Sequence, residues 1–166
     1  MVTHEIQSRI TGSTPLVLVL DDDLLHGALV SMVLTRAGFI VRHAQTLEDA
    51  IVCVVQNAPD LILANWDIDG IDGRAAVLAL RRKVFDLRTT PALLLSDRSI
   101  SEKLRMQLSR ENFCWILEKP IVATSLPKLA SCTIAGARGL AVRAQWRAAQ
   151  LVASGDTASV LIDAVR

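Results

Sequence analysis

The sequence predicts an α/β fold, a doubly wound parallel sheet of five strands with helices on both faces. Three observations indicate this fold. From Leu16 onward, short apolar runs alternate with longer amphipathic stretches, the pattern of βαβ units whose strands are buried on both faces. Apolar residues make up 51% of the chain and aromatic residues only 4%, so aliphatic side chains must build the core, as in most buried parallel sheets. Polar residues, mainly acidic, follow several of the apolar runs.

The predicted strands are short apolar runs, each bounded by Gly, Pro, Asp or a polar turn. They are Leu16–Leu20, Phe39–Arg42, Leu61–Ala64, Ala92–Leu95 and Trp115–Leu117. The amphipathic stretches between and after them predict helices over Leu24–Ala37, which Gly38 closes, Leu47–Gln56, Arg74–Lys83, Glu102–Ser109 and a stretch beginning near Ser125.

Residues near the starts of three predicted helices can cap them. Thr46 with Asp49, and Ser99 with Glu102, place a hydroxyl and a carboxylate three residues apart. Such a pair can satisfy free amide donors of a first helical turn. Asp23 directly precedes the first helix, so we interpret it as a cap rather than a ligand.

The chain is expected to divide into a flexible polar leader over residues 1–14, one α/β domain over 15–135 and a helical C-terminal extension over 136–166. Helices as short as those of the extension are marginal in water, so its apolar face needs a surface on which to pack. Trp146 lies among Arg and Gln residues of the extension and is the best candidate for a protein interface.

Composition excludes several classes of function. The formal net charge is +1, which provides no global attraction to nucleic acid or to an anionic membrane. Arg138, Arg143 and Arg147 are offset by Asp156 and Asp163, and no recognition motif is visible, so nucleic-acid binding is not expected. No apolar run is long enough for a signal peptide or a membrane span, and the cysteines lack metal-ligand spacing. We therefore expect a cytoplasmic protein with reduced thiols.

The polar residues that follow the strands predict a functional site, because ligands of doubly wound sheets bind at the carboxyl ends of the strands. Carboxylates suit a hard cation, a hydroxyl can donate to phosphoryl oxygens, and a lysine can neutralise developing charge. The set therefore predicts a site for Mg²⁺-assisted phosphoryl transfer. Its members are Asp21 and Asp22 after the first strand, Asn65, Asp67, Asp69 and Asp72 after the third, Ser96 and Asp97 after the fourth, and Lys119 and Pro120 after the fifth.

Four blocks of the sequence resemble the signature blocks of response-regulator receiver domains, the CheY-like domains of bacterial two-component phosphorelays. These blocks are VLVLDDD, DLILANWDIDGIDG, PALLLSD and WILEKPI, in the family's order and at about its spacing. The resemblance covers roughly two thirds of the chain, and the combination is far more specific than any single motif. It implies a flavodoxin-like sheet with the strand order 2-1-3-4-5.

The resemblance also implies roles for individual residues. Asp21 and Asp22 match the metal-binding acidic pair, Ser96 matches the hydroxyl residue, and Lys119 matches the lysine that contacts the phosphoryl group. The peptide bond between Lys119 and Pro120 is expected to be cis, as it usually is in this family.

The main departure from the family is Asn65, which stands where the phosphorylated aspartate should be. A carboxamide has no anionic oxygen to attack a phosphoryl donor, so acyl-phosphate formation at this position is excluded. Losing the charge also removes a ligand that Mg²⁺ prefers, so we expect Mg²⁺ as the only cofactor and only weakly bound. Asp67 and Asp69 could restore negative charge in a rearranged metal site with Asp21 and Asp22.

The second departure is Ile116, at the switch position where receivers commonly place an aromatic residue. Isoleucine is stiff and has no polar tip. Two interpretations stay open: a degenerate scaffold that does not switch, and a pseudo-receiver held permanently in one signalling conformation. His4, His26 and His43 show no ligand spacing, so surface or packing roles are the default for all three.

The leading hypothesis is a stand-alone atypical response regulator that binds partner proteins and is not an enzyme. Its expected partners are a histidine kinase, a phosphotransfer protein or a second copy, which would dock through the C-terminal helices or the fourth and fifth helices. One alternative is a Mg²⁺-dependent phosphatase, because the run Asp67, Ile68, Asp69, Gly70 resembles the nucleophile loop of haloacid-dehalogenase-type enzymes. Another is phosphorylation at Asp67, although this residue lies about 6 to 7 Å of extended chain beyond Asn65.

Overall fold

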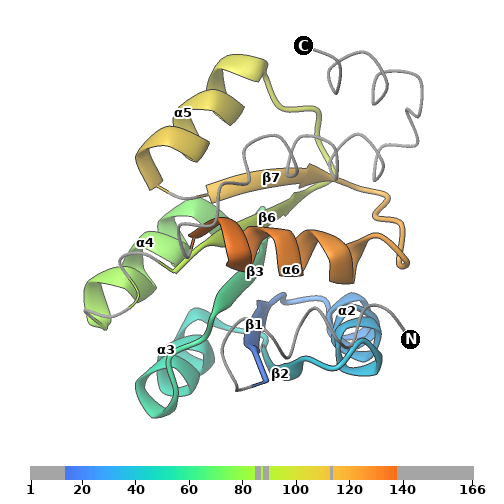
Figure 1. The fold of residues 1–166 in the computed structure, drawn as a ribbon. Coiled ribbons are helices and arrows are strands. Elements are labelled where there is room, and N and C mark those ends of the chain that lie inside the picture. The colour runs from blue at the N-terminus through green and yellow to red at the C-terminus, as the bar shows by residue number, and fades with distance from the viewer. Residues whose placement is uncertain (1–13, 85–86, 88–89, 113, 138–166) are drawn as a thin grey trace.

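The computed structural model describes residues 14–84, 87, 90–112 and 114–137. Apart from two short strands that follow the third strand of the main sheet, strands and helices alternate along this part of the chain (Figure 1). The elements are β1 (Leu16–Leu20), α2 (Leu24–Arg36), β2 (Ile40–Ala44), α3 (Leu47–Gln56), β3 (Leu61–Asn65), β4 (Asp67–Ile68), β5 (Ile71–Asp72), α4 (Gly73–Lys83), β6 (Ala92–Ser96), α5 (Glu102–Asn112), β7 (Cys114–Glu118) and α6 (Leu126–Ala137).

The main sheet has five parallel strands in the order β2-β1-β3-β6-β7. This order is the predicted 2-1-3-4-5, because β6 and β7 are the fourth and fifth strands of the main sheet. The prediction of a flavodoxin-like, doubly wound fold is therefore confirmed. A parallel sheet of this kind brings the carboxyl ends of all its strands to one edge.

Helices cover both faces of the sheet, and successive side chains of each strand enter two separate cores (Figure 1). Val17 and Val19 of β1 pack in the core beneath α2 and α6. Leu18 and Leu20 of the same strand pack in the core beneath α3, α4 and α5. All four side chains are almost completely buried, which accounts for a strand that is apolar without interruption.

The predicted strands lie within one or two residues of the observed ones, but a short hairpin was missed. Strands β4 and β5 pair antiparallel, with Asp67 opposite Asp72 and Ile68 opposite Ile71. Asp69 and Gly70 form the turn with φ angles of 50° and 79°, and this positive-φ pair is typical of the tight turns that join hairpin strands. Two-residue strands are too short to give an alternating pattern, which is why the sequence indicated only a loop here.

The capping predictions had mixed outcomes. Thr46 caps α3, since its hydroxyl accepts the amide hydrogen of Asp49 at 3.1 Å. Asp23 caps α2 as predicted, accepting from the amides of Leu25 and His26. The prediction for Ser99 was wrong: α5 begins at Glu102, and Ser101 is the residue whose hydroxyl accepts a first-turn amide, that of Leu104.

Helix α6 ends at Ala137, two residues past the predicted domain boundary at 135. The predicted leader over residues 1–14, apart from Thr14, and nearly all of the predicted extension over 136–166, including Trp146, lie outside the described residues. Within the described part of the chain, no helix combines the length and apolar character that a membrane span requires.

Candidate functional site

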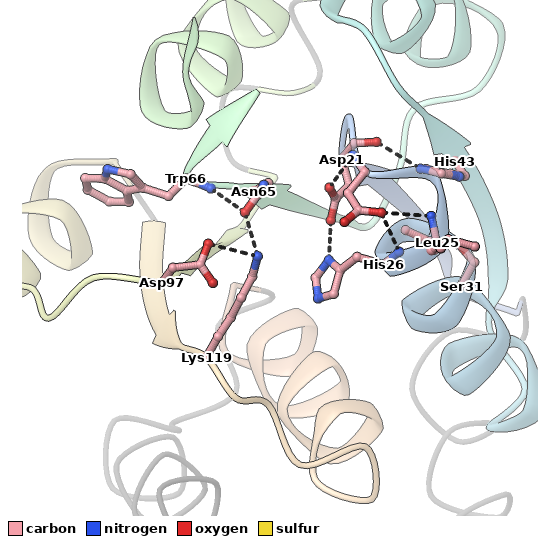
Figure 2. Close-up of polar contacts among 11 residues, drawn as sticks. Asp21, Leu25, His26, Ser31, His43, Asn65, Trp66, Asp97 and Lys119 are labelled. Carbon is pink, nitrogen blue, oxygen red and sulfur yellow. Dashed lines mark hydrogen bonds and ion pairs between the residues drawn. The ribbon is translucent and has the colours of Figure 1, made fainter. Parts of the chain in front are cut away.

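Four strands of the main sheet bring polar residues to its carboxyl edge. Asp21 follows β1, Asn65 ends β3, Ser96 ends β6 and Lys119 follows β7. The first two lie on adjacent central strands, and Lys119 reaches toward Asn65 from the far side of β6 (Figure 2). We call Asp21 and Asp22 the acidic side of the site, and Asn65, Ser96 and Lys119 its acceptor side.

Asp21 on the acidic side is 1% exposed and makes internal hydrogen bonds with both of its carboxylate oxygens. Oδ1 accepts the backbone amide of Asp23 at 3.0 Å. Oδ2 accepts from Nδ1 of His26 at 2.5 Å, a short contact between an imidazole and a carboxylate (Figure 2). The backbone oxygen of Asp21 accepts from Nε2 of His43 at 3.1 Å. The most buried carboxylate of the site is thus satisfied from within the chain.

Asp22 is exposed and points instead to the hairpin. Its Oδ2 accepts the backbone amide of Asp69 at 3.0 Å. Within the hairpin, Asp67 Oδ1 accepts the amide of Gly70 at 2.9 Å. Asp69 therefore contributes an amide hydrogen to the acidic side, and the carboxylate of Asp67 holds its own turn.

Asn65 and Lys119 form the centre of the acceptor side. Asn65 Oδ1 accepts from Lys119 Nζ at 3.0 Å and from the backbone amide of Trp66 at 3.1 Å. Nζ also lies 3.4 Å from Oδ2 of Asp97, an exposed carboxylate (Figure 2). Both groups that face Oδ1 are donors, which identifies this atom as the carboxamide oxygen. The predicted acceptor position and the predicted phosphoryl-binding lysine do meet.

Ser96 lies at the acceptor side but turns toward its own loop. Its side chain is completely buried, and its hydroxyl donates to the carbonyl of Arg98 at 3.0 Å and accepts the Arg98 amide at 3.1 Å. The Ser96 carbonyl accepts the amide of Lys119 at 2.8 Å, which positions the start of the following loop. The Lys119–Pro120 peptide bond is cis, as expected.

Ile116, the switch position, is 1% exposed and packs inside the core beneath α5. Arg105 of α5 binds this part of β7 by donating to the Ile116 carbonyl at 3.2 Å and pairing with the Glu118 carboxylate. It also lies 3.4 Å from the carbonyl of Ile100, whose amide donates to the same carboxylate at 3.1 Å. Arg105 thus joins α5, the loop before it and β7.

The start of α4 packs directly against Asn65. A Cβ atom added to Gly73 would lie 2.1 Å from the Asn65 carbonyl oxygen, so this close approach of two backbones requires glycine. Asp72 caps α4 and pairs with Arg74, whose guanidinium lies 5.0 Å from the ring centroid of Trp66. The hydrogen bonds from the Arg74 side chain lower the pKa of Asp72.

Comparison with known proteins agrees with this architecture. Residues 17–131 match the family model described as the response regulator receiver domain. The chain belongs to the response regulator receiver family. It is accordingly a receiver domain of two-component signalling, and such domains work with signalling proteins such as kinases. No sequence among curated proteins matches it.

Solved receiver structures resemble this receiver over most of its length. Chemotaxis protein CheY4 of Vibrio cholerae is 25% identical with a TM-score of 0.64, and the match covers 72% of this chain and 98% of that one. The receiver domain of Francisella response regulator 1452 is 22% identical with a TM-score of 0.62, covering 73% and 97%. NtrX of Brucella abortus, solved with ADP, is 22% identical with a TM-score of 0.65, covering 76% of this chain and 28% of NtrX.

The receiver fold implies a Mg²⁺ ion, but the described side chains do not fit one. Mg²⁺ requires several oxygen ligands in near-octahedral geometry. In the part of the chain that the structure describes, no group of three or more His, Cys, Asp or Glu residues is arranged to hold a metal. Asp21 uses both oxygens internally, and Asn65 Oδ1 faces the ammonium of Lys119.

Sequence reasoning missed His26 and His43 of this receiver. Both were assigned surface or packing roles, whereas both contact Asp21. A signal for His26 was available, because Asp21 directly follows the first strand and Asp23 caps the next helix, which places residue 26 in the first helical turn, close to Asp21. No comparable signal existed for His43, whose contact depends on the pairing of β1 with β2.

Proposed function

We propose that this receiver signals by binding partner proteins and is not phosphorylated at Asn65. One observation supports the proposal above others: the acceptor position presents a carboxamide oxygen that already accepts from Lys119 Nζ and from the Trp66 amide. A neutral amide oxygen is a poor nucleophile, and here its lone pairs face two donors. In this proposal the protein is not an enzyme.

The arrangement around Arg105 supports a surface that needs no phosphorylation to form. Arg105 binds the Ile116 carbonyl and Glu118, and it pairs α5 with the last strand of the sheet. Ile116 is already inside the core. We infer that the face formed by α5, β7 and α6, the fourth and fifth helices of the prediction with the strand between them, is held in one arrangement. This face, or residues of the predicted extension such as Trp146, would bind a histidine kinase, a phosphotransfer protein or a second copy in the cytoplasm.

The alternatives receive less support from the positions of Asp67 and Asp69. The Asp67 carboxylate accepts the Gly70 amide within the hairpin, and Asp69 occupies the turn with positive φ. Lys119 Nζ, which would stabilise a phosphoryl group, faces Asn65 and Asp97 instead. Phosphorylation at a substitute aspartate, or phosphatase chemistry on this loop, would therefore require the hairpin to refold.

The test is to incubate the native protein and the Asn65→Asp variant with acetyl phosphate and Mg²⁺ and to follow intact mass. The native protein should stay unmodified, and the variant should gain an acid-stable, base-labile phosphoryl group at residue 65. A phosphorylation-competent receiver in the same mixture shows that the donor is active. Labelling of the native protein that Asp67→Asn or Asp69→Asn removes would overturn the proposal in favour of a substitute acceptor.

The enzymatic alternative has its own measurement. Hydrolysis of p-nitrophenyl phosphate with Mg²⁺ should not exceed the protein-free blank. Turnover that disappears in Asp67→Asn, but persists in Asn65→Asp, would instead assign a phosphatase to the hairpin.

A further inference from the structure

We propose that His26 occupies the place of a divalent cation as the partner of Asp21, so that this receiver holds its acidic side together without metal. The proposal is independent of whether Asn65 is phosphorylated, because it rests on contacts around β1 and α2. His26 is here a positioning residue with no role in any reaction step.

The first step of the argument is the occupancy of the Asp21 carboxylate. A buried carboxylate must have partners, because an unpaired charge away from water is very costly. Asp21 is 1% exposed, and its two oxygens accept from His26 Nδ1 at 2.5 Å and from the Asp23 amide at 3.0 Å. A metal ligated by Oδ2 would have to displace the imidazole. The chain itself thus supplies what a bound cation would otherwise supply.

The second step is that the neighbouring oxygens do not favour a cation. Asp22 Oδ2 accepts the Asp69 amide at 3.0 Å, so the Asp22 carboxylate points toward the hairpin. Asn65 is neutral, and its oxygen lies 3.0 Å from the ammonium of Lys119. A divalent ion would therefore lack attraction to a third carboxylate at position 65, and the positive charge of Lys119 would repel it.

The third step concerns how firmly His26 is held. It lies in the first turn of α2, whose start Asp23 fixes by accepting the amides of Leu25 and His26. The side chain of His26 is 27% exposed, whereas that of Asp21 is only 1% exposed. Replacing His26 should leave the fold in place and uncover the Asp21 carboxylate.

The experiment is a Mg²⁺ titration at one fixed pH, without any phosphoryl donor, of the native protein, His26→Ala and His26→Met. Backbone amide shifts of Asp21–Asp23 and Asn65–Trp66 report binding at the site. The matched control is His43→Ala, which removes a histidine that contacts the Asp21 carbonyl but not its carboxylate. Thermal unfolding of each protein with and without Mg²⁺ provides a second readout, since an ion that binds the folded state raises Tm.

Both His26 variants should bind Mg²⁺ at least about tenfold more tightly than the native protein, the factor expected when a hydrogen bond to a charged group no longer competes. His43→Ala should titrate like the native protein. The same series in an Asn65→Asp background should show the same order, with tighter binding throughout because a carboxylate is restored.

Equal Mg²⁺ affinity with and without His26 in both backgrounds would overturn the proposal, as would tighter binding in His43→Ala alone. Absence of binding in every variant would also overturn it, because something other than His26 would then exclude the ion. None of these outcomes depends on phosphorylation, so a failure here is distinct from a failure of the proposed function.

Discussion

The acidic and acceptor sides of the site have departed from the expected chemistry in opposite ways. The acidic side keeps both predicted carboxylates, but His26 and the Asp69 amide engage them. The acceptor side keeps the expected meeting of its lysine with residue 65, but that residue is an amide. The acidic side thus has the expected residues with unexpected partners. The acceptor side has the expected lysine, but a changed residue at position 65.

This difference teaches that a site can differ from the expected one in two ways, and only one of them is visible in a motif. A substitution such as Asn65 for aspartate is read directly from the sequence. An internal partner such as His26 appears only when the elements are placed in space. Restoring the acceptor side should require one added carboxylate, whereas restoring the acidic side should require removal of a side chain.

The two sides also differ in what surrounds them, and two glycines allow a comparison. Gly73 faces the backbone of Asn65 on the acceptor side, and Gly27 faces the imidazole of His43 on the acidic side. A backbone carbonyl in a central strand cannot move without moving the sheet, but a half-buried side chain on the edge strand β2 can rotate away.

Gly73→Ala should have the largest effect on stability. The added Cβ would lie 2.1 Å from the Asn65 carbonyl oxygen. We expect a loss of about 3 kcal/mol in the free energy of unfolding, the upper end of overpacking costs, together with shifted amide resonances at Asn65 and Trp66. Urea denaturation measures the free energy of unfolding, and NMR measures the amide resonances. A loss of less than about 0.5 kcal/mol, within the range of ordinary surface substitutions, would show that the acceptor side is not rigid.

Gly27→Ala should cost less. Its Cβ would lie 2.1 Å from His43 Nε2, a side-chain atom that can move. The gain of helix propensity on replacing glycine offsets part of the overpacking, so we expect a net loss of about 1 to 2 kcal/mol. The substitution His43→Ala removes the side chain that the new Cβ would meet. In a double-mutant cycle, the variant with both Gly27→Ala and His43→Ala should therefore recover most of the stability that Gly27→Ala alone loses. Strictly additive losses would contradict this account.

Asp72→Ala should have the smallest effect and a defined pH dependence. The loss of a helix cap costs about 1 kcal/mol at neutral pH. The pKa of Asp72 is lowered from 3.8, chiefly by the hydrogen bonds from Arg74, so its charge stabilises the fold above that value and the contribution disappears as the pH falls through the folded-state pKa. The gap between native and variant should narrow below about pH 4, as measured by urea denaturation at several pH values.

Asp72→Asn is the matched control for this prediction. Asparagine caps helices as well as aspartate does, so the variant should keep most of the stability. The Asp72→Asn variant should also lack the part of the native protein's stability that the Asp72 charge provides and that disappears as the pH falls below 3.8. If Asp72→Ala and the native protein lost stability in parallel on acidification, the charge of Asp72 would have no part in it.

Most of the fold was predictable because the strands of the central sheet are buried on both faces. Leu16–Leu20 was predicted with its observed ends, since an uninterrupted short apolar run bounded by polar turns is typical of a buried parallel strand. The exposed edge strand β2 was placed one residue early at its start and two short at its end. The hairpin of β4 and β5 was missed, although Asp69 and Gly70 are a typical turn pair.

The site was predictable only in part, because its residues follow the strands but its contacts depend on side-chain directions. The meeting of Asn65 with Lys119 was implied by the resemblance to receiver domains, which places both residues at the phosphoryl site. The hydroxyl of Ser96 instead closes a turn with Arg98, and His26 binds Asp21. Such local hydrogen bonds compete with longer-range ones, and no sequence pattern decides between them.

The direction of helix α6 determines where the chain leaves the described part of the domain. It starts after the loop that follows Lys119 and runs back along the sheet to Ala137, so its last turn lies at the end away from the site (Figure 1). Twelve helical residues correspond to a displacement of about 18 Å. The chain therefore leaves the described part of the domain at the end of the sheet opposite the site.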